Sequence, residues 1–359
     1  MTNKVWFQTA VAIIFTLVII RLFIEVQQVF SPLFVVAETI FLPLLIGGAL
    51  FYLTRPVLYF LQKKKFPKWA AISLIFSLMT LFVWLFYILL APIVLAQLNS
   101  LVANGPAIFQ KIEEYGQYLL TQRDLLPDSV REQAISMTGQ FSNWASNISS
   151  WLFSFLMGLF SGILALFLAP FFLIYMLVDH QKFAPFVAHF FTGERRTWIR
   201  KTLHDVDKTL KSYIVGQLFV SLILGGMLLI GYSIIGLDYA FLLALIGVMT
   251  NVIPFLGPYI AVIPAIMVAL VQDPIMAIYV AGIMLISQQI EGDLITPNIM
   301  GNVLNVHPLT VITLILAAGN IAGIWGIILA VPFYAVIKII VANIYSKRKE
   351  IEKTATKEV

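Results

Sequence analysis

Hydrophobic residues in this chain form long, nearly uninterrupted runs, and polar residues gather between those runs. A helix that crosses the hydrocarbon core of a bilayer needs about 20 consecutive residues that are mostly apolar. Six runs fit such helices, and we predict membrane spans at residues 5–24, 33–54, 69–95, 151–178, 212–236 and 275–290. The pattern therefore predicts an all-α, polytopic transmembrane helical bundle.

Two further apolar regions, residues 239–272 and 308–332, are broken near their middle. The breaks lie at 251–258 and 319–323, and each arm beside them is too short for a straight crossing. Proline and glycine interrupt helices, and a broken helix at membrane depth must be sheltered by protein or line a water-filled cavity. We predict two broken helical hairpins, which are either re-entrant or cross twice, so the bundle has about six to eight spans.

Basic residues indicate which segments face the cytoplasm. Residues 55–68, 179–211 and 347–359 carry an excess of Lys and Arg, whereas 96–150 holds three basic residues against five acids. The positive-inside rule places the first three segments in the cytoplasm and the last one outside. Both termini are then cytoplasmic, whether the broken hairpins are re-entrant or cross twice.

The expected organisation has four parts. In the extracytoplasmic part, apolar residues recur at the three-to-four spacing of an amphipathic helix, namely at Ile108, Ile112, Tyr115 and Leu119. The parts are N-terminal transmembrane helices in 1–95, an extracytoplasmic amphipathic helical segment in 96–150, a transmembrane core with a cytoplasmic loop at 179–211 in 151–346, and a cytoplasmic basic tail in 347–359.

Composition excludes several classes of protein. Of the 359 residues, 60% are hydrophobic and 11% are charged, against about 25% charged residues in soluble domains. The absence of cysteine excludes disulfides, thiolate zinc sites and iron–sulfur clusters. The sequence contains no phosphate-binding loop, no His-Glu-x-x-His and no Gly-x-Ser-x-Gly. We expect neither an enzyme nor a bound cofactor, and topology explains the net charge of +5 without a nucleic-acid partner.

The first break supplies one set of candidate pathway residues: Asn251, Pro254, Gly257 and Pro258. The two prolines lack a backbone N–H, and the glycine permits unusual dihedral angles. Backbone carbonyls freed in this way bind cations or polar solutes in the discontinuous helices of transporters. The alternative is a plain tight turn between two helices.

The second set follows the last predicted span. Ionisable groups at membrane depth are costly and tend to mark ion or substrate paths, and Glu291 is a candidate proton carrier. The alternative is a solvated cytoplasmic loop whose carboxylates face water. His307 is either a pH-sensitive hinge or the start of a helix. The candidates are Gln288, Glu291, Gly292, Asp293, Pro297, Asn298, Gly301, His307 and Asn320, with no metal site among them.

Several of these segments resemble the autoinducer-2 exporter (AI-2E) family of bacterial membrane proteins. The order and spacing of the motifs match the family. The stretches that carry the resemblance are residues 254–260 with 263–265, 291–301, 306–309 and 326–332. The diagnostic motifs therefore lie in the last third of the chain, and the layout of most of the chain agrees with them.

The resemblance implies a multi-pass permease of the bacterial cytoplasmic (inner) membrane that works without a nucleotide-binding domain. Some members are associated with export of the quorum-sensing signal autoinducer-2, and others with sodium (lithium)/proton antiport. The resemblance also implies a homo-oligomer, with a pentamer as the expected state.

Three functions stay open at this point. The leading hypothesis is outward secondary transport of a small polar solute, with or without coupling to H⁺ or Na⁺. In that hypothesis the two broken regions meet, and Glu291 and Asp293 act together at the cytoplasmic mouth. The second is a cation/proton antiporter in which Glu291 carries the proton. The third is a non-transporting membrane scaffold that recruits partners through 96–150 or the cytoplasmic loop.

Overall fold

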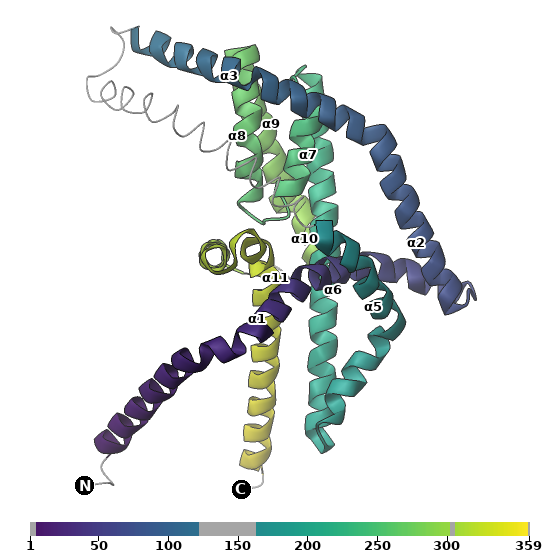
Figure 1. The fold of residues 1–359 in the computed structure, drawn as a ribbon, viewed down its shortest axis with the longest axis vertical. Coiled ribbons are helices and arrows are strands. Elements are labelled where there is room, and N and C mark those ends of the chain that lie inside the picture. Colours follow the sequence, from purple (N-terminus) through teal and green to yellow (C-terminus); the bar gives the residue numbers. More distant parts are fainter. Residues whose placement is uncertain (1–4, 122–162, 302–305, 358–359) are drawn as a thin grey trace. The chain divides into compact units, whose positions relative to one another are not determined.

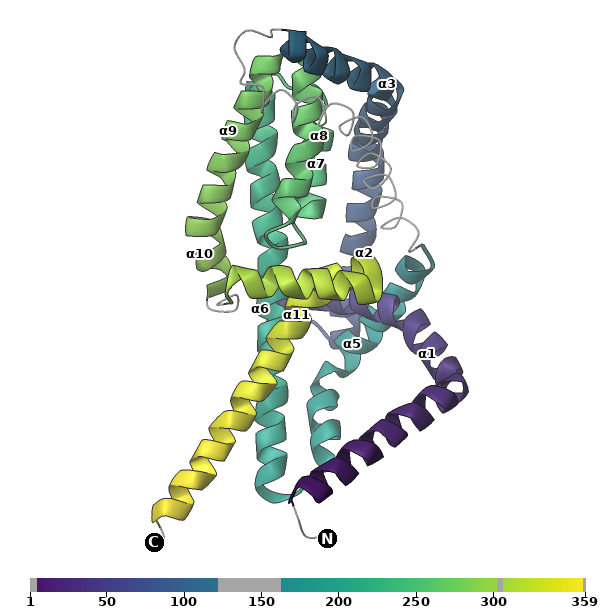
Figure 2. The ribbon, with the colours of Figure 1, turned by 90° about the vertical axis from the view of Figure 1, so that its left-hand side faces the viewer.

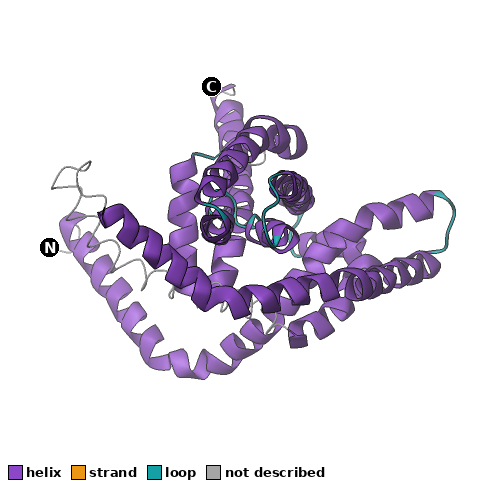
Figure 3. Cartoon of the chain, turned by 90° about the horizontal axis from the view of Figure 1, so that it is seen from above, coloured by secondary structure: helices purple, strands orange, loops and turns teal. Residues whose placement is uncertain are grey.

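A computed structural model describes residues 5–121, 163–301 and 306–357, which are helical apart from short connections (Figure 1, Figure 3). None of these described residues belongs to a strand, and five of their helices are long and apolar enough to cross a membrane. The predicted class, a polytopic helical membrane bundle, is therefore confirmed. The chain forms two compact units, Met1–Phe51 with Ser161–Met176 and Tyr52–Phe160 with Leu177–Val359.

The first unit pairs the N-terminal part of α1 (Val5–Lys63) with the first half of α5 (Ile163–His189). A Cβ atom at Gly47 would lie 2.8 Å from the Phe172 Cβ and 3.0 Å from the Ala169 carbonyl oxygen. Only a glycine lets the two backbones approach this closely, which is the usual role of small residues between membrane helices.

The separation expected between the spans 5–24 and 33–54 is absent, because α1 runs through both as one helix. Residues between the two runs include no glycine, and Pro32 by itself bends a helix rather than ending it. Arg21 and Glu25, one turn apart at 3.4 Å, also favour a continuous helix here.

In the second unit, α2 (Lys68–Leu85), a π-helical turn η1 (Phe86–Leu90) and α3 (Ala91–Thr121) follow one another without a loop. The span predicted at 69–95 therefore continues as helix into the segment expected outside the membrane. The helix predicted in 96–150 is confirmed as far as Thr121, and the rest of that segment lies outside the described residues.

The charged segment 179–211, expected as a cytoplasmic loop, is almost entirely helical. Helix α5 continues to His189, and α6 (Gly193–Ile234) begins directly after residues 190–192. The segment is helical because Lys, Arg and Glu are good helix formers, so a membrane helix can extend into water through charged turns. The span predicted at 212–236 is confirmed as the C-terminal part of α6. The side of the membrane that this region faces stays a prediction.

The first broken hairpin is confirmed as a structure. Helices α7 (Ala240–Thr250) and α8 (Gly257–Gln272) have only 11 and 16 residues, and they pack against each other (Figure 2). Helix α6 covers α7, and α9 (Pro274–Ile290) lies along α8. A π-helical turn η3 (Glu291–Ile295) and α10 (Thr296–Met300) then prolong α9. The buried side chains between these helices include Leu224, Leu228, Leu243, Ala261, Ala265 and Val280.

The second broken hairpin lies within α11 (Pro308–Lys357). The backbone leaves the helix at Ala322 (φ −131°, ψ 20°) and at Gly323 (φ 57°, ψ −140°), so the predicted break is confirmed. The two arms then touch, because a Cβ atom at Gly326 would overlap the Ala318 carbonyl oxygen. Whether either hairpin re-enters the membrane or crosses it twice stays a prediction.

Candidate transport site

A row of polar side chains runs along one face of α6. Tyr213, Gln217 and Ser221 follow one another at intervals of four residues, which places them on the same side of a helix. Their exposed fractions are 4%, 7% and 1%. Polar groups buried this deeply need hydrogen-bond partners, so this face of α6 identifies an internal polar region within an apolar bundle.

Asn251, at the end of α7, meets this row. Its Nδ2 donates a hydrogen bond to the Ser221 Oγ at 3.3 Å, and its carbonyl oxygen accepts one from the Gln217 Nε2 at 2.5 Å. The last carbonyls of a helix have no partner within that helix, so the break frees this oxygen for a side chain. Asn251 is 1% exposed, and its polar atoms therefore face the interior.

Gly257 closes the turn between α7 and α8. A Cβ atom at this position would lie 2.6 Å from the Asn251 Cα and would overlap the Thr250 carbonyl oxygen. Pro254 is buried in the turn, and Pro258 occupies the first turn of α8, where its missing N–H is not needed. These three residues shape the turn that presents Asn251.

Glu291 brings a carboxylate to Asn251 from the end of α9. The Gln288 Nε2 donates to its Oε2 at 2.8 Å, and the Asn251 side-chain amide lies close enough to interact with the carboxylate. Ser287, one turn earlier, is also buried, with 3% exposure. Glu291 opens a π-helical turn, a feature frequent at functional sites. Glu291 is therefore partly buried and lies in a helical turn, and its access to water stays open. We call Gln217, Ser221, Asn251, Gln288 and Glu291 the polar cluster.

Four other predicted residues of this helix are exposed, namely Gly292, Asp293, Pro297 and Asn298. The Gln289 Nε2 donates to the Asp293 carboxylate, and the Asn298 Nδ2 donates to the Leu294 carbonyl oxygen at 2.7 Å. The structure separates Glu291 from Asp293 by burial, because the first carboxylate is partly buried and the second is exposed, and their joint role stays a prediction. Residues two apart on a helix point in different directions.

Gly301, His307 and Asn320 also lie apart from the polar cluster. Gly301 follows α10 with φ 56°. The His307 Nδ1 accepts a hydrogen bond from the Leu309 N–H at 3.3 Å, which agrees with the helix-start alternative. Asn320 is exposed and donates to the Leu316 carbonyl oxygen at 3.1 Å.

The two broken hairpins meet at Tyr213. Its ring packs in a cluster with Ile253 of the first hairpin and with Val311 and Ala330 of the second. Figure 2 shows the first arm of α11 passing below the α7–α8 turn. The buried Tyr213 hydroxyl has no hydrogen-bond partner among the described residues. The first break thus packs in one cluster with the arms of the second hairpin, while the meeting of the two breaks themselves stays a prediction. One turn of α6 separates this cluster from Gln217.

Sequence reasoning missed the α6 contribution to this site. A usable signal was present, because three polar residues at four-residue spacing interrupt an otherwise apolar stretch. The part of the chain that the structure describes holds no group of three His, Asp or Glu side chains placed for a metal. The cluster instead offers one carboxylate with amide, hydroxyl and carbonyl oxygens, the ligand type that hard cations prefer.

Comparison with known proteins agrees with this architecture. A family model described as AI-2E family transporter matches residues 10–346. The chain belongs to the AI-2E family. It is 35% identical to the "Putative transport protein YueF" of Bacillus subtilis (strain 168) over 350 residues, which cover 95% of this chain and 94% of that protein.

Two further relatives extend the comparison. The "Putative transport protein YrrI" of the same bacterium is 30% identical over 93% of this chain and 95% of its own length. The "Putative permease PerM" of Escherichia coli (strain K12) is 23% identical over 83% of this chain and 86% of its own length. The resemblance seen in the motifs is thus confirmed, and the chain is a multi-pass membrane protein of a transporter family.

Proposed function

We propose that this AI-2E protein is a secondary transporter that moves a small polar solute outward, with autoinducer-2 as the first solute to test. The polar cluster is the proposed binding site. The basic segments face the cytoplasm in this proposal, so the protein lies in a bacterial cytoplasmic membrane with both termini inside.

The contact between Gln217, Asn251 and Glu291 carries the proposal. A polar solute loses hydrogen bonds to water when it enters an apolar bundle, and unreplaced bonds make that entry costly. The cluster supplies amide donors, a hydroxyl and a carboxylate at a helix break, which is where transporters of other folds bind their substrates. Each of these groups can exchange its present protein partner for the solute.

The α7–α8 hairpin is the proposed moving element. Its tight closure at Gly257 makes it a stiff unit, and it meets the second hairpin through the Tyr213 cluster. Rocking of the two hairpins against α6 would open the polar cluster first to one side and then to the other. Alternating access then requires no nucleotide hydrolysis.

Counterflow in proteoliposomes tests the binding site. Asn251→Leu preserves volume and keeps the backbone carbonyl that accepts from Gln217, but it removes the side-chain amide that donates to the Ser221 Oγ. We expect solute exchange to fall by about tenfold or more, because a solute loses this polar partner. Asn298→Leu is the matched control, because Asn298 is exposed and bonds only within its own helix turn. Equal losses in both variants would remove the polar cluster from the pathway. If neither solute nor ion flux is found in the wild type, the transporter proposal fails.

Sodium/proton antiport is the second candidate, and the position of Glu291 favours it. A single carboxylate that accepts a hydrogen bond from the Gln288 amide, beside carbonyl and hydroxyl oxygens, can bind either Na⁺ or H⁺. Under antiport, Glu291→Gln abolishes the Na⁺-driven collapse of a pH gradient in proteoliposomes. Asp293→Asn, two residues away and exposed, leaves it intact. Unchanged Na⁺ response in Glu291→Gln would rule out antiport through this residue.

A further inference from the structure

A buried hydroxyl inside an apolar layer marks a second functional position on α6. The Tyr213 cluster consists of the Tyr213 ring and the aliphatic side chains packed with it, namely Ile253, Val311, Ile315, Ala330 and Val331. Each of these residues is at most 6% exposed. The Tyr213 hydroxyl is the one polar side-chain group among the six, and it has no hydrogen-bond partner in the part of the chain that the structure describes.

This hydroxyl weakens the packing in which it lies. A hydroxyl loses its hydrogen bonds to water when it is buried, and no described residue replaces them here. Phenylalanine has the same ring and would fill the same place without this cost. The hydroxyl therefore has its use in an arrangement in which the aliphatic side chains have moved and a polar partner has taken their place.

Tyr213 lies between the polar cluster and the predicted cytoplasmic side. It is the second residue of the span predicted at 212–236, and Gln217 follows one turn further into that span. Tyr213, Gln217 and Ser221 occupy one face of α6, and the last two already form hydrogen bonds with Asn251. In the predicted topology, a solute that travels from the cytoplasm along this face meets Tyr213 before it meets the polar cluster.

Both broken hairpins contribute to the layer that covers this position. Ile253 belongs to the turn between α7 and α8, whereas Val311 and Ala330 come from the two arms of α11. Separation of either hairpin from α6 removes side chains from around Tyr213 and uncovers its hydroxyl. The layer is therefore placed to close the polar cluster toward the cytoplasm.

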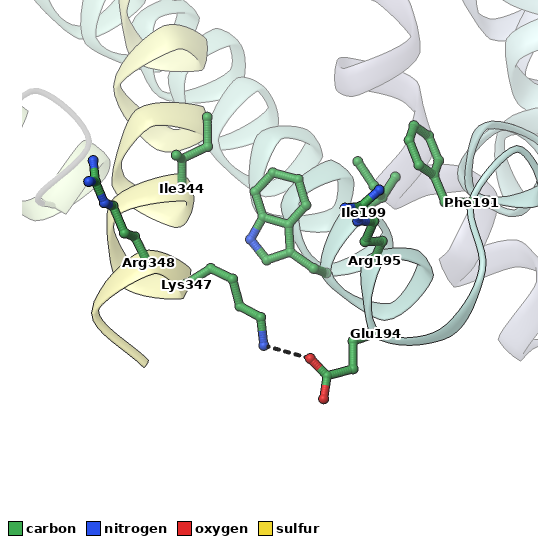
Figure 4. A pocket seen from close by; sticks show the side chains of 8 residues that line it. Phe191, Glu194, Arg195, Ile199, Ile344, Lys347 and Arg348 are labelled. Carbon is green, nitrogen blue, oxygen red and sulfur yellow. Dashed lines mark hydrogen bonds and ion pairs between the residues drawn. The ribbon is translucent and has the colours of Figure 1, made fainter. Parts of the chain in front are cut away.

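The far ends of α6 and α11 supply a fixed point for such a movement. The Trp198 Nε1 donates to the Asn343 carbonyl oxygen at 3.3 Å, and Figure 4 shows Lys347 of α11 paired with Glu194 of α6, at 3.2 Å. The stretch of helix between Ala330 and Asn343 is about 20 Å long. A rotation about this contact thus moves the part of α11 beside Tyr213 further than it moves the anchored end.

We infer that the Tyr213 cluster is the cytoplasmic gate of the solute pathway and that the Tyr213 hydroxyl binds the solute as it passes. The inference rests on the proposed function, because a gate requires a pathway. In the structure the aliphatic side chains cover Tyr213 and bar polar molecules. In the open arrangement the hydroxyl, which both donates and accepts, bonds to the solute before Gln217 does. The gate therefore favours a solute that carries hydroxyl or carbonyl groups.

Tyr232 provides a matched control on the same helix. It is 1% exposed, and its hydroxyl likewise has no hydrogen-bond partner among the described residues. It packs with Leu228, Leu237 and other apolar residues of α6, α7, α8 and α9, and this cluster includes no residue of either break. Loss of a buried phenol is therefore comparable at the two positions, and only the loss of Tyr213 should change access to the polar cluster.

Cysteine accessibility tests the gate without knowledge of the solute. The chain contains no cysteine, so Ser221→Cys places a single thiol in the polar cluster. Inside-out membrane vesicles are treated with a membrane-impermeant methanethiosulfonate reagent. We expect Tyr213→Ala to raise the rate of modification about tenfold or more, because the ring no longer fills the layer, and Tyr232→Ala to leave it within about twofold. Equal rates in the two variants, or a rise confined to right-side-out vesicles, would overturn the gate.

Removal of the hydroxyl alone tests its contact with the solute. We expect Tyr213→Phe to lower the maximal rate of autoinducer-2 exchange in proteoliposomes about fivefold, which corresponds to a hydrogen bond of about 1 kcal/mol. Its melting temperature should not fall, because the hydroxyl stabilises nothing in the closed arrangement. Tyr232→Phe should keep the exchange rate within about twofold. A lower melting temperature with unchanged exchange in Tyr213→Phe would reveal a permanent partner for the hydroxyl and contradict the inference.

The two measurements separate failure of the gate from failure of the proposed function. If the wild type exchanges no autoinducer-2, transport of that solute and its contact with the hydroxyl are both wrong, while the modification of Ser221→Cys still decides whether Tyr213 closes the polar cluster. If the wild type exchanges the solute and the Tyr213 variants behave like the Tyr232 variants, the gate is wrong and the proposed function stands.

Discussion

At the scale of single residues, Gly257 controls the geometry of the candidate site. Gly257→Ala places a methyl group 2.6 Å from the Asn251 Cα, and the turn must move to accept it. We expect a loss of about 1–3 kcal/mol in the free energy of unfolding, measured by SDS titration in mixed micelles. Gly282→Ala is the control, because a Cβ atom there meets nothing within 4 Å. Equal stability of the two variants would contradict the close approach.

His180 provides a residue-scale prediction about pH, and it lies beyond the span predicted at 151–178. Burial lowers the pKa of His180, and the positive charges of Arg55 and Lys68 act in the same direction, although a hydrogen bond to the Leu177 carbonyl opposes them. The neutral ring accepts from the Tyr59 hydroxyl at its Nε2, 3.0 Å away.

The sign of the pH effect follows from that lowered pKa. As the pH falls, His180 takes up its proton more readily in the unfolded chain than in the folded one. The contribution of the neutral His180 ring to the free energy of unfolding is therefore complete above about pH 6.5 and declines as the pH falls below that value. We expect the melting temperature of the wild type to drop more between pH 7.5 and 5.5 than that of His180→Gln. His204→Gln, at an exposed position on α6, should follow the wild type. Parallel curves for wild type and His180→Gln would refute this prediction.

At the scale of elements, the π-helical turn η3 sets the direction of Glu291. A π turn contains one extra residue, so deleting Gly292 restores the regular α-helical period. Because the extra residue and the wide turn disappear together, α10 keeps its direction and Met300 keeps its contact with Gly216 of α6, whereas the side chains within the turn, including Glu291, are displaced. We expect the deleted protein to insert and lose flux, whereas Gly292→Ala retains it. Full flux in the deletion variant would show that the turn has no role.

The break in α11 depends on one backbone conformation. Gly323 has φ 57° and ψ −140°, a region essentially restricted to glycine. Gly323→Ala should therefore lower the free energy of unfolding by about 1–3 kcal/mol and loosen the contact between the arms. Crosslinking of cysteines introduced at Ala318 and Ile327 measures that contact, and it should fall in Gly323→Ala but persist in Gly226→Ala. Undiminished crosslinking would show that the hairpin does not require this conformation.

At the scale of the whole molecule, long-range polar contacts connect helices that are distant in sequence. Within the second unit, the Arg55 Nη1 donates to both Asp207 carboxylate oxygens, at 2.9 and 2.8 Å, and the Tyr52 hydroxyl donates to the same group at 3.2 Å. The Arg55 Nε donates to the Tyr59 hydroxyl at 3.2 Å, and that hydroxyl reaches His180. The network thus ties the C-terminal end of α1 to α5 and α6.

A double-mutant cycle measures that connection. The side chains of Arg55 and Asp207 are only 16% and 35% exposed, so Asp207→Asn leaves a partly buried guanidinium without its counter-charge. We expect replacement of Arg55 alone or of Asp207 alone to lower the free energy of unfolding by about 1–2 kcal/mol each. Replacement of both residues should lower it by less than the sum of the two single losses. Glu25→Gln, which breaks the exposed pair with Arg21, should change stability by less than about 0.5 kcal/mol. Strict additivity would mean that the pair does not couple α1 to α6.

The sequence alone was sufficient to predict the helical class and both breaks, because apolar run length and the effects of proline and glycine are local properties of the chain. Its motifs were sufficient to indicate the family. It could not show that α1 is continuous or that 179–211 is helical, since charged residues are compatible with both loop and helix. Only the tertiary structure decided which polar groups meet. Asn251 finds Ser221 and Gln217 through contacts 30 and 34 residues apart, and Glu291 joins them while Asp293 does not. The physical reason is that a hydrogen bond between distant residues forms only where helix packing brings donor and acceptor to the same place and excludes water from them.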